Sequence, residues 1–118
     1  MPRNKFEARI YASLKKKTDP KTGSKIKFKY ESEKIPYLIS GHYIPDFIIT
    51  TRRGKIYVET KGHFRPEAKR KMAAVKRLNP RLDIRILFYS HSKSSVKWCV
   101  KHGFPYAIGD IPNEWLEE

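Results

Sequence analysis

Two short apolar stretches of the sequence each carry one carboxylate where a buried strand would favour a hydrophobic side chain. Asp46 lies within residues 44–49, and Glu59 follows thirteen positions later, two residues before Lys61. Carboxylate oxygens are the ligands that hard cations such as Mg²⁺ prefer, and a nearby lysine can orient an attacking water or stabilise charge on a phosphorane. Asp46 and Glu59, called the acidic pair below, therefore predict metal-dependent hydrolysis of a phosphodiester.

A simpler interpretation gives these residues no catalytic role. Asp46 would then cap a turn that begins at Pro45, and Glu59 and Lys61 would form an ion pair on the exposed face of a strand. We favour the catalytic interpretation because the apolar flanks, the Glu-X-Lys spacing and a strongly basic chain occur together.

The charge of the chain indicates a polyanionic partner. The 118 residues include 26 Lys and Arg against 12 Asp and Glu, which gives a formal net charge of +14. This excess is far larger than solubility requires, and nucleic acid is the commonest polyanion. An anionic membrane is the alternative, but no apolar run approaches the roughly 18 residues of a spanning helix.

Composition and length limit the classes of protein to which this chain can belong. The hydrophobic fraction of 39% excludes a disordered chain, and 118 residues predict one domain over 1–118. The first five residues contain no apolar signal-peptide core, and a single cysteine, Cys99, allows neither an intramolecular disulfide nor a zinc site. We therefore expect a cytoplasmic protein.

The N-terminal part is predicted to form a helix followed by extended segments. Apolar residues at every fourth position predict a helix over residues 3–17. Glu7 lies beside this stripe and by itself is an ordinary first-turn acid. Alternating basic and apolar residues predict a strand over residues 25–30, and a second extended piece follows over residues 33–39.

The acidic pair is predicted to lie on a β-hairpin. Residues 43–50 and 55–61 have strand character, and residues 51–54 form the turn between them. Alternation along the second strand places Glu59 and Lys61 on the same face. We therefore expect the two carboxylates to converge at one end of a sheet.

The rest of the chain alternates between helices and strands. The predicted elements are a helix from Pro66 to the Asn79-Pro80 stop, a strand over 83–89, a helix over 94–102, a strand over 104–108 and a terminal turn over 112–116. The residues predicted to face the core are Ala68, Met72, Val75 and Leu78 on the first of these helices, and Val96, Cys99 and Val100 on the second. This order predicts an α/β fold with a mixed sheet flanked by helices.

Several basic side chains near the acidic pair are candidates for DNA binding. They would hold phosphates and make binding depend strongly on salt, although a solvated helix face explains any one of them equally well. His63 could also assist a leaving group. The candidates are Lys5, His63, Arg65, Lys69 and Arg70.

The set Pro45-Asp46 and Glu59-Thr60-Lys61 resembles the PD-(D/E)XK nuclease superfamily. Longer segments resemble one member of it, the bacteriophage endonuclease I family of Holliday-junction-resolving enzymes. These segments are residues 26–31, 34–39, 44–47, 58–62, 82–88, 99–103 and 111–115.

The resemblance implies a restriction-endonuclease-like fold and a structure-selective endodeoxyribonuclease that cleaves branched double-stranded DNA in a phage-infected or prophage-carrying bacterium. It implies two Mg²⁺ or Mn²⁺ ions in each active site. The implied catalytic residues are Glu7, Asp46, Glu59 and Lys61, and the implied metal ligands are Asp46, Glu59 and the backbone carbonyl of Thr60. It also implies a segment-exchanged homodimer in which Glu7 acts in trans and the chain crosses near residues 38–43.

Two other functions remain open. One is a nicking or site-specific endonuclease of the same superfamily, although the chain has little room for a separate base-reading module. The other is a non-catalytic DNA-binding protein whose acids are vestigial. A nuclease should lose cleavage but keep junction binding in Asp46→Ala or Glu59→Ala, whereas a DNA-binding protein should not cleave in any metal.

Overall fold

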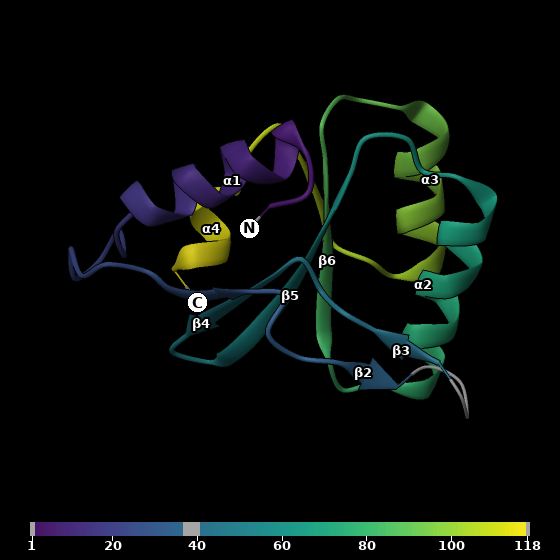
Figure 1. The fold of residues 1–118 in the computed structure, drawn as a ribbon, viewed down its shortest axis with the longest axis horizontal. Coiled ribbons are helices and arrows are strands. Elements are labelled where there is room, and N and C mark those ends of the chain that lie inside the picture. Colours follow the sequence, from purple (N-terminus) through teal and green to yellow (C-terminus); the bar gives the residue numbers. More distant parts are fainter. Residues whose placement is uncertain (1, 37–40, 118) are drawn as a thin grey trace.

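The computed structural model describes residues 2–36 and 41–117. A mixed five-stranded sheet lies between two pairs of helices, with α1 and α4 on one face and α2 and α3 on the other (Figure 1). The elements in chain order are α1 (Lys5–Lys16), β1 (Lys27–Tyr30), β2 (Ile35–Pro36), β3 (His42–Tyr43), β4 (Phe47–Thr51), β5 (Gly54–Lys61), α2 (Pro66–Leu78), β6 (Asp83–Phe88), α3 (Lys93–His102), β7 (Tyr106–Ile108) and α4 (Asn113–Leu116).

The sheet combines an antiparallel half with a parallel half. Its strand order is β1-β4-β5-β6-β7; β1, β4 and β5 pair antiparallel, whereas β5, β6 and β7 pair parallel. Thr51 pairs with Gly54 at the hairpin between β4 and β5, which confirms the predicted turn. Parallel neighbours need crossover connections, and α2 and α3 supply them on one face of the sheet. The predicted mixed α/β fold is therefore confirmed.

Strict alternation along the strands builds a hydrophobic core on each face. Each buried Ile, Val or Phe side chain contributes about 1.5–3 kcal/mol to folding, so the two cores fix the strands firmly. The strand residues that face α2 and α3 include Ile48, Tyr57, Ile84, Ile86 and Phe88. Those that face α1 and α4 include Phe47, Ile49, Ile56, Val58 and Leu87.

The helix ends follow local sequence signals. Asn4 caps α1, and its side-chain oxygen accepts a hydrogen bond from the backbone N–H of Glu7 at 2.8 Å. Gly103 ends α3 with a φ of 75°, a left-handed conformation that glycine adopts without steric cost. The cap on α1 matters for the site because it fixes the turn that carries Glu7.

The predicted strand over residues 43–50 is wrong as a single element. Tyr43 belongs to β3, which pairs with Ile35 of β2 in a separate two-stranded sheet, and β4 begins only at Phe47. Pro45 explains the break, since a proline has no N–H for a ladder hydrogen bond. Asp46 therefore stands just before β4. Part of the predicted extended piece, residues 37–39, lies outside the described residues.

Two predicted core residues are exposed. Leu78 is 51% exposed because it ends α2 beyond Val75, the last residue of that helix to join the core. Val100 is 68% exposed because it follows the buried Cys99, and successive side chains on a helix differ by about 100° in direction. Trp115, in α4, is buried.

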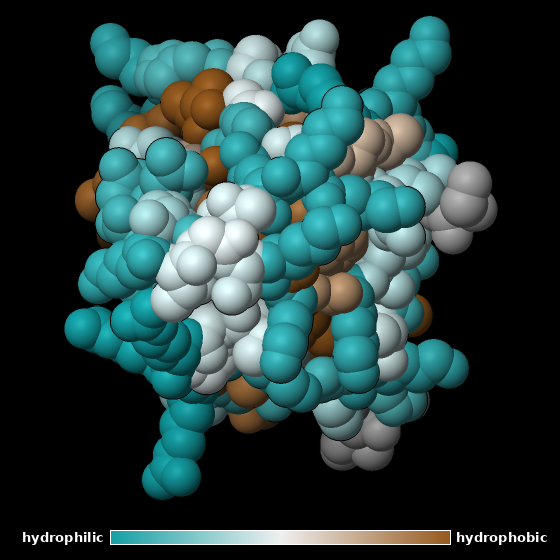
Figure 2. Space-filling model, turned by 90° about the vertical axis from the view of Figure 1, so that its left-hand side faces the viewer, coloured by the Kyte–Doolittle hydropathy of each residue, from teal (hydrophilic) through white to brown (hydrophobic). Residues whose placement is uncertain are grey.

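Figure 2 shows the side of the molecule on which α1 and α4 lie, where hydrophilic side chains leave only small hydrophobic patches. This surface agrees with a chain that carries 26 Lys and Arg. Within residues 2–36 and 41–117, no helix has both the length and the apolar character needed to cross a membrane.

Candidate active site

The acidic pair lies where the carboxyl end of β5 meets the start of β4 and the first turn of α1. A cavity of about 370 Å³ opens at this point. Its lining combines carboxylates with basic and small residues: Arg3, Asn4, Glu7, Asp46, Glu59, Thr60, Lys61, Gly62 and His63. Four residues predicted from the sequence, Glu7, Asp46, Glu59 and Lys61, are therefore brought together around one cavity.

Asp46 is held in a fixed orientation by β5. Its Oδ2 accepts hydrogen bonds from the backbone N–H and the hydroxyl of Thr60, both at 2.8 Å, and only 1% of the residue is exposed. Burial raises the pKa of Asp46 and the charge of Glu7 raises it further, while the hydrogen bonds from Thr60 oppose that rise. The other oxygen, Oδ1, is left to face the cavity and Arg3.

Glu59 is buried against a tyrosine and a lysine. Its Oε1 accepts a hydrogen bond from the Tyr43 hydroxyl at 2.9 Å, and its Oε2 lies 3.1 Å from Lys61 Nζ. This contact confirms that Glu59 and Lys61 share a face of β5. Burial and the charge of Asp46 raise the pKa of Glu59 to about 7. Glu59 therefore carries a carboxyl group that can gain or lose a proton near neutral pH.

Glu7 is part of the site and is only 4% exposed, unlike an ordinary surface acid in a first turn. It accepts hydrogen bonds from the Tyr30 hydroxyl and, at 3.1 Å, from Asn4 Nδ2. Within the single chain Glu7 lies on the same cavity as Asp46. Its action in trans stays a prediction, and residues 38–40 of the implied crossing segment lie outside the described residues.

Glu31, which was not predicted from the sequence, contributes a further carboxylate. Glu31 directly follows β1 with a φ of 47°, and its backbone N–H donates to the Asp46 carbonyl at 3.1 Å. The β1–β4 register, which pairs Tyr30 with Phe47, places Glu31 opposite Asp46. Knowledge of this strand pairing could have identified Glu31 as a site residue, because no regular spacing in the sequence links Glu31 to Asp46.

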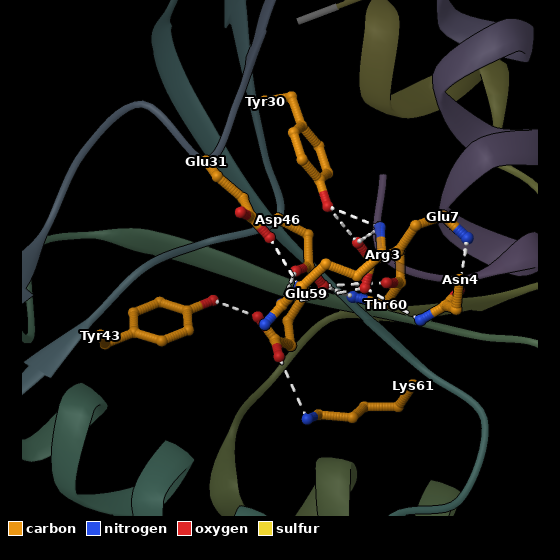
Figure 3. A network of polar contacts seen from close by, with 10 residues as sticks. All are labelled: Arg3, Asn4, Glu7, Tyr30, Glu31, Tyr43, Asp46, Glu59, Thr60 and Lys61. Atoms are coloured by element: carbon orange, nitrogen blue, oxygen red, sulfur yellow. Dashed lines mark hydrogen bonds and ion pairs between the residues drawn. The ribbon is translucent and has the colours of Figure 1, made fainter. Parts of the chain in front are cut away.

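The carboxylates offer a set of ligands that fits a divalent cation. Glu7, Glu31 and Asp46 each present one oxygen, and the three oxygens all lie within 4.8 Å of one another. Hard cations prefer such oxygen ligands. Of the three implied ligands, only Asp46 belongs to this set. Glu59 turns toward Tyr43 and Lys61 instead of joining it (Figure 3), and the backbone carbonyl of Thr60 stays a predicted ligand.

The predicted DNA-binding residues lie on α1, on α2 and on the segment between β5 and α2. His63 lines the cavity, and Lys5 is the first residue of α1. Arg65 precedes α2 as its N-cap residue, Lys69 Nζ lies 5.6 Å from the centre of the Phe64 ring, and Arg70 is exposed on α2. Their contact with DNA stays a prediction.

Comparisons with known proteins agree with this geometry. A family model described as phage endonuclease I matches residues 3–118. The chain is similar to endonuclease I of Escherichia phage T7, with 40% identity over 104 residues that cover 79% of this chain and 68% of the relative. It is also similar to endodeoxyribonuclease 1 of Enterobacteria phage T3, with 36% identity over 104 residues, 79% of this chain and 66% of the relative. The chain thus spans about two thirds of the length of each relative.

Proposed function

The chain belongs to the phage endonuclease I family, and on that premise we propose that it is a metal-dependent endodeoxyribonuclease that cleaves branched DNA, in particular four-way junctions. One relative is named an endonuclease, and the other is named an endodeoxyribonuclease. The observation that carries the proposal is Asp46, which is buried, fixed by two hydrogen bonds from Thr60 and placed on one cavity with Glu7, Glu59 and Lys61.

Each residue of the site has a separate part in phosphodiester hydrolysis. Asp46, with Glu7 and Glu31, would hold Mg²⁺ or Mn²⁺. When bound, such an ion polarises a phosphate oxygen and makes a bound water more acidic. Lys61 places a positive charge beside the site, where it can stabilise the negative charge that develops on the phosphorane. Glu59 holds Lys61 at 3.1 Å and so fixes that charge.

Selectivity for branched DNA and a homodimer with two active sites belong to the same proposal. Resolution of a junction requires paired cuts in two strands, and a symmetric dimer supplies two sites. Basic side chains around the cavity would hold the phosphates on both sides of the cut, so affinity should fall steeply as salt rises. These side chains are Lys5, His63, Arg65, Lys69 and Arg70.

Cleavage of a labelled four-way junction tests the proposal. The purified protein is incubated with the junction and with a linear duplex, in Mg²⁺, in Mn²⁺ and in EDTA. We expect metal-dependent paired cuts near the branch point and an intact duplex. Asp46→Asn should bind the junction without cutting it, whereas Asp19→Asn, a change in a distant surface loop, should cut like the parent. Junction binding without cleavage in either metal would refute the proposal. Equal cutting of the linear duplex would show that the enzyme does not select branched DNA.

Mixing two inactive variants tests the exchanged dimer. Glu7→Ala and Asp46→Ala chains are allowed to exchange subunits before the junction is added. If the two carboxylates of one site come from different chains, hybrid dimers regain one complete site and nick the junction. If both come from one chain, each site in the hybrid lacks a carboxylate, and no nicking is recovered.

A further inference from the structure

Arg3 lies at the centre of the carboxylate cluster (Figure 3). Its Nη2 is 3.1 Å from Asp46 Oδ1 and 3.9 Å from Glu7 Oε2, and its Nε is 2.9 Å from Glu31 Oε2. These are the three carboxylates whose oxygens lie within 4.8 Å of one another. One guanidinium therefore neutralises the same group of oxygens that fits a divalent cation.

The guanidinium and a divalent cation would compete for these oxygens. Asp46 Oδ2 is occupied by the Thr60 N–H and hydroxyl, so Oδ1 is the oxygen left for a cation, and Arg3 is bonded to it. Without a cation the three carboxylates would repel one another at this spacing. Arg3 thus offsets the repulsion between these carboxylates, and a metal ion would compete with it for Asp46 Oδ1.

Arg3 also lines two cavities. It lines the cavity of about 370 Å³ that contains Glu7 and His63, and it lines a second one of about 260 Å³ that contains Glu31, His42 and Lys71. Its backbone N–H is held by the Tyr30 hydroxyl at 3.2 Å, whereas 66% of its side chain is exposed. The side chain can therefore leave Asp46 while the backbone stays in place.

We propose that Arg3 is a positioning residue that acts as a built-in counter-cation. In the metal-free protein it holds Glu7, Glu31 and Asp46 at the spacing of metal ligands, and an entering divalent cation displaces its guanidinium toward the second cavity. This inference rests on the metal site of the proposed function and adds to it a competitor that the protein itself supplies.

Binding of Mn²⁺ in the absence of DNA tests this competition. Isothermal titration compares the parent with Arg3→Gln, which removes the charge but keeps a polar side chain. Because 66% of the Arg3 side chain is exposed, solvent screens its ion pairs, and each contributes modestly. We therefore expect Arg3→Gln to lower the Kd for Mn²⁺ by about tenfold. Arg52→Gln is the matched control, because Arg52 is similarly exposed, carries the same charge and pairs with Asp19 outside the site. Its Kd should equal that of the parent.

Thermal unfolding separates this role from a merely structural one. In EDTA, Arg3→Gln should have a lower Tm than the parent because the carboxylates lose their counter-cation. Saturating Mn²⁺ should then raise its Tm by more than it raises that of the parent. A merely structural role for Arg3 predicts the same deficit in Tm with and without Mn²⁺, and that result would overturn the proposal.

The outcomes distinguish this inference from the proposed function. If the parent binds Mn²⁺ and Asp46→Asn loses that binding, the metal site is supported. If Arg3→Gln then has the Kd of the parent or a higher one, the role of Arg3 is refuted. If neither the parent nor Arg3→Gln binds Mn²⁺, the metal site fails and this inference fails with it.

Discussion

Glu59→Gln should stabilise the metal-free protein at neutral and alkaline pH. Burial and the charge of Asp46 raise the pKa of this carboxyl from its ordinary 4.5 to about 7. The native state therefore holds the proton more tightly than the unfolded chain does, and the parent loses stability as pH rises from about 4.5 to about 7. The raised pKa of Asp46 acts in the same direction. The glutamine side chain of the variant has no charge to bury, so the part of the loss that Glu59 causes disappears.

The size of the effect follows from the pKa and the contacts. A rise from 4.5 to about 7 corresponds to roughly 3 kcal/mol of stability lost by the parent once the carboxyl is ionised. The value of about 7 already includes the attraction of Lys61 Nζ at 3.1 Å, so the loss of this ion pair in the variant is not subtracted a second time, and the variant keeps an oxygen for the Tyr43 hydroxyl. We therefore expect a net gain of roughly 3 kcal/mol at pH 8 and no gain at pH 4.5.

Urea unfolding in EDTA at several values between pH 4.5 and pH 8 measures this gain. Glu67→Gln, which changes an exposed carboxylate in the first turn of α2, is the control and should stay within about 0.5 kcal/mol of the parent throughout. A Glu59→Gln variant whose difference from the parent is the same at every pH would refute the reasoning, since a buried charge can destabilise the protein only where it is ionised.

Four further changes test other parts of the structure. Thr60→Val removes one of the two hydrogen bonds to Asp46 and should cost about 1–2 kcal/mol in urea unfolding, while Thr60→Ser should restore most of it; equal stability of the two variants would contradict this. Glu31→Gln should raise the Kd for Mn²⁺ in titration, and an unchanged Kd would exclude Glu31 as a ligand. Lys61→Met should abolish junction cleavage but leave junction binding in EDTA intact, and retained cleavage would show that Lys61 has no catalytic role. Gly103→Ala should destabilise the fold by about 1 kcal/mol at its φ of 75° without changing cleavage, whereas a loss of cleavage at full stability would show a functional role.

Residue type and strand periodicity were sufficient to find the centre of the candidate site. Glu59 and Lys61 differ by two positions on a strand, so alternation alone places them on one face. The burial of Asp46 follows from the apolar residues around it. Glu7 was different, because nothing in its local sequence distinguishes it from a solvated first-turn acid, and only the family resemblance assigned it a role.

The residues that the sequence did not reveal depend on long-range pairing. Glu31 lies beside Asp46 only because of the β1–β4 register. In the sequence, Arg3 cannot be distinguished from the other Lys and Arg residues, which number 26 in all; only the fold shows its contact with Asp46. The wrong core assignments of Leu78 and Val100 have a similar origin. Periodicity gives the direction of a side chain on its helix, but the neighbouring elements decide whether anything covers it.

The packing of α1 against the C-terminal part of the chain has a consequence for protein synthesis. Arg9 Nη2 donates to the Gly109 carbonyl at 2.7 Å, Lys17 Nζ lies 3.1 Å from Asp110 Oδ2, and the apolar stripe of α1 shares a core with Ile111 and Trp115. A ribosome makes α1 and the β4–β5 hairpin long before it makes residues 109–116. The helix that carries Glu7 therefore completes its packing only after residues 109–116 have been made, so the full set of contacts around this helix forms late in folding.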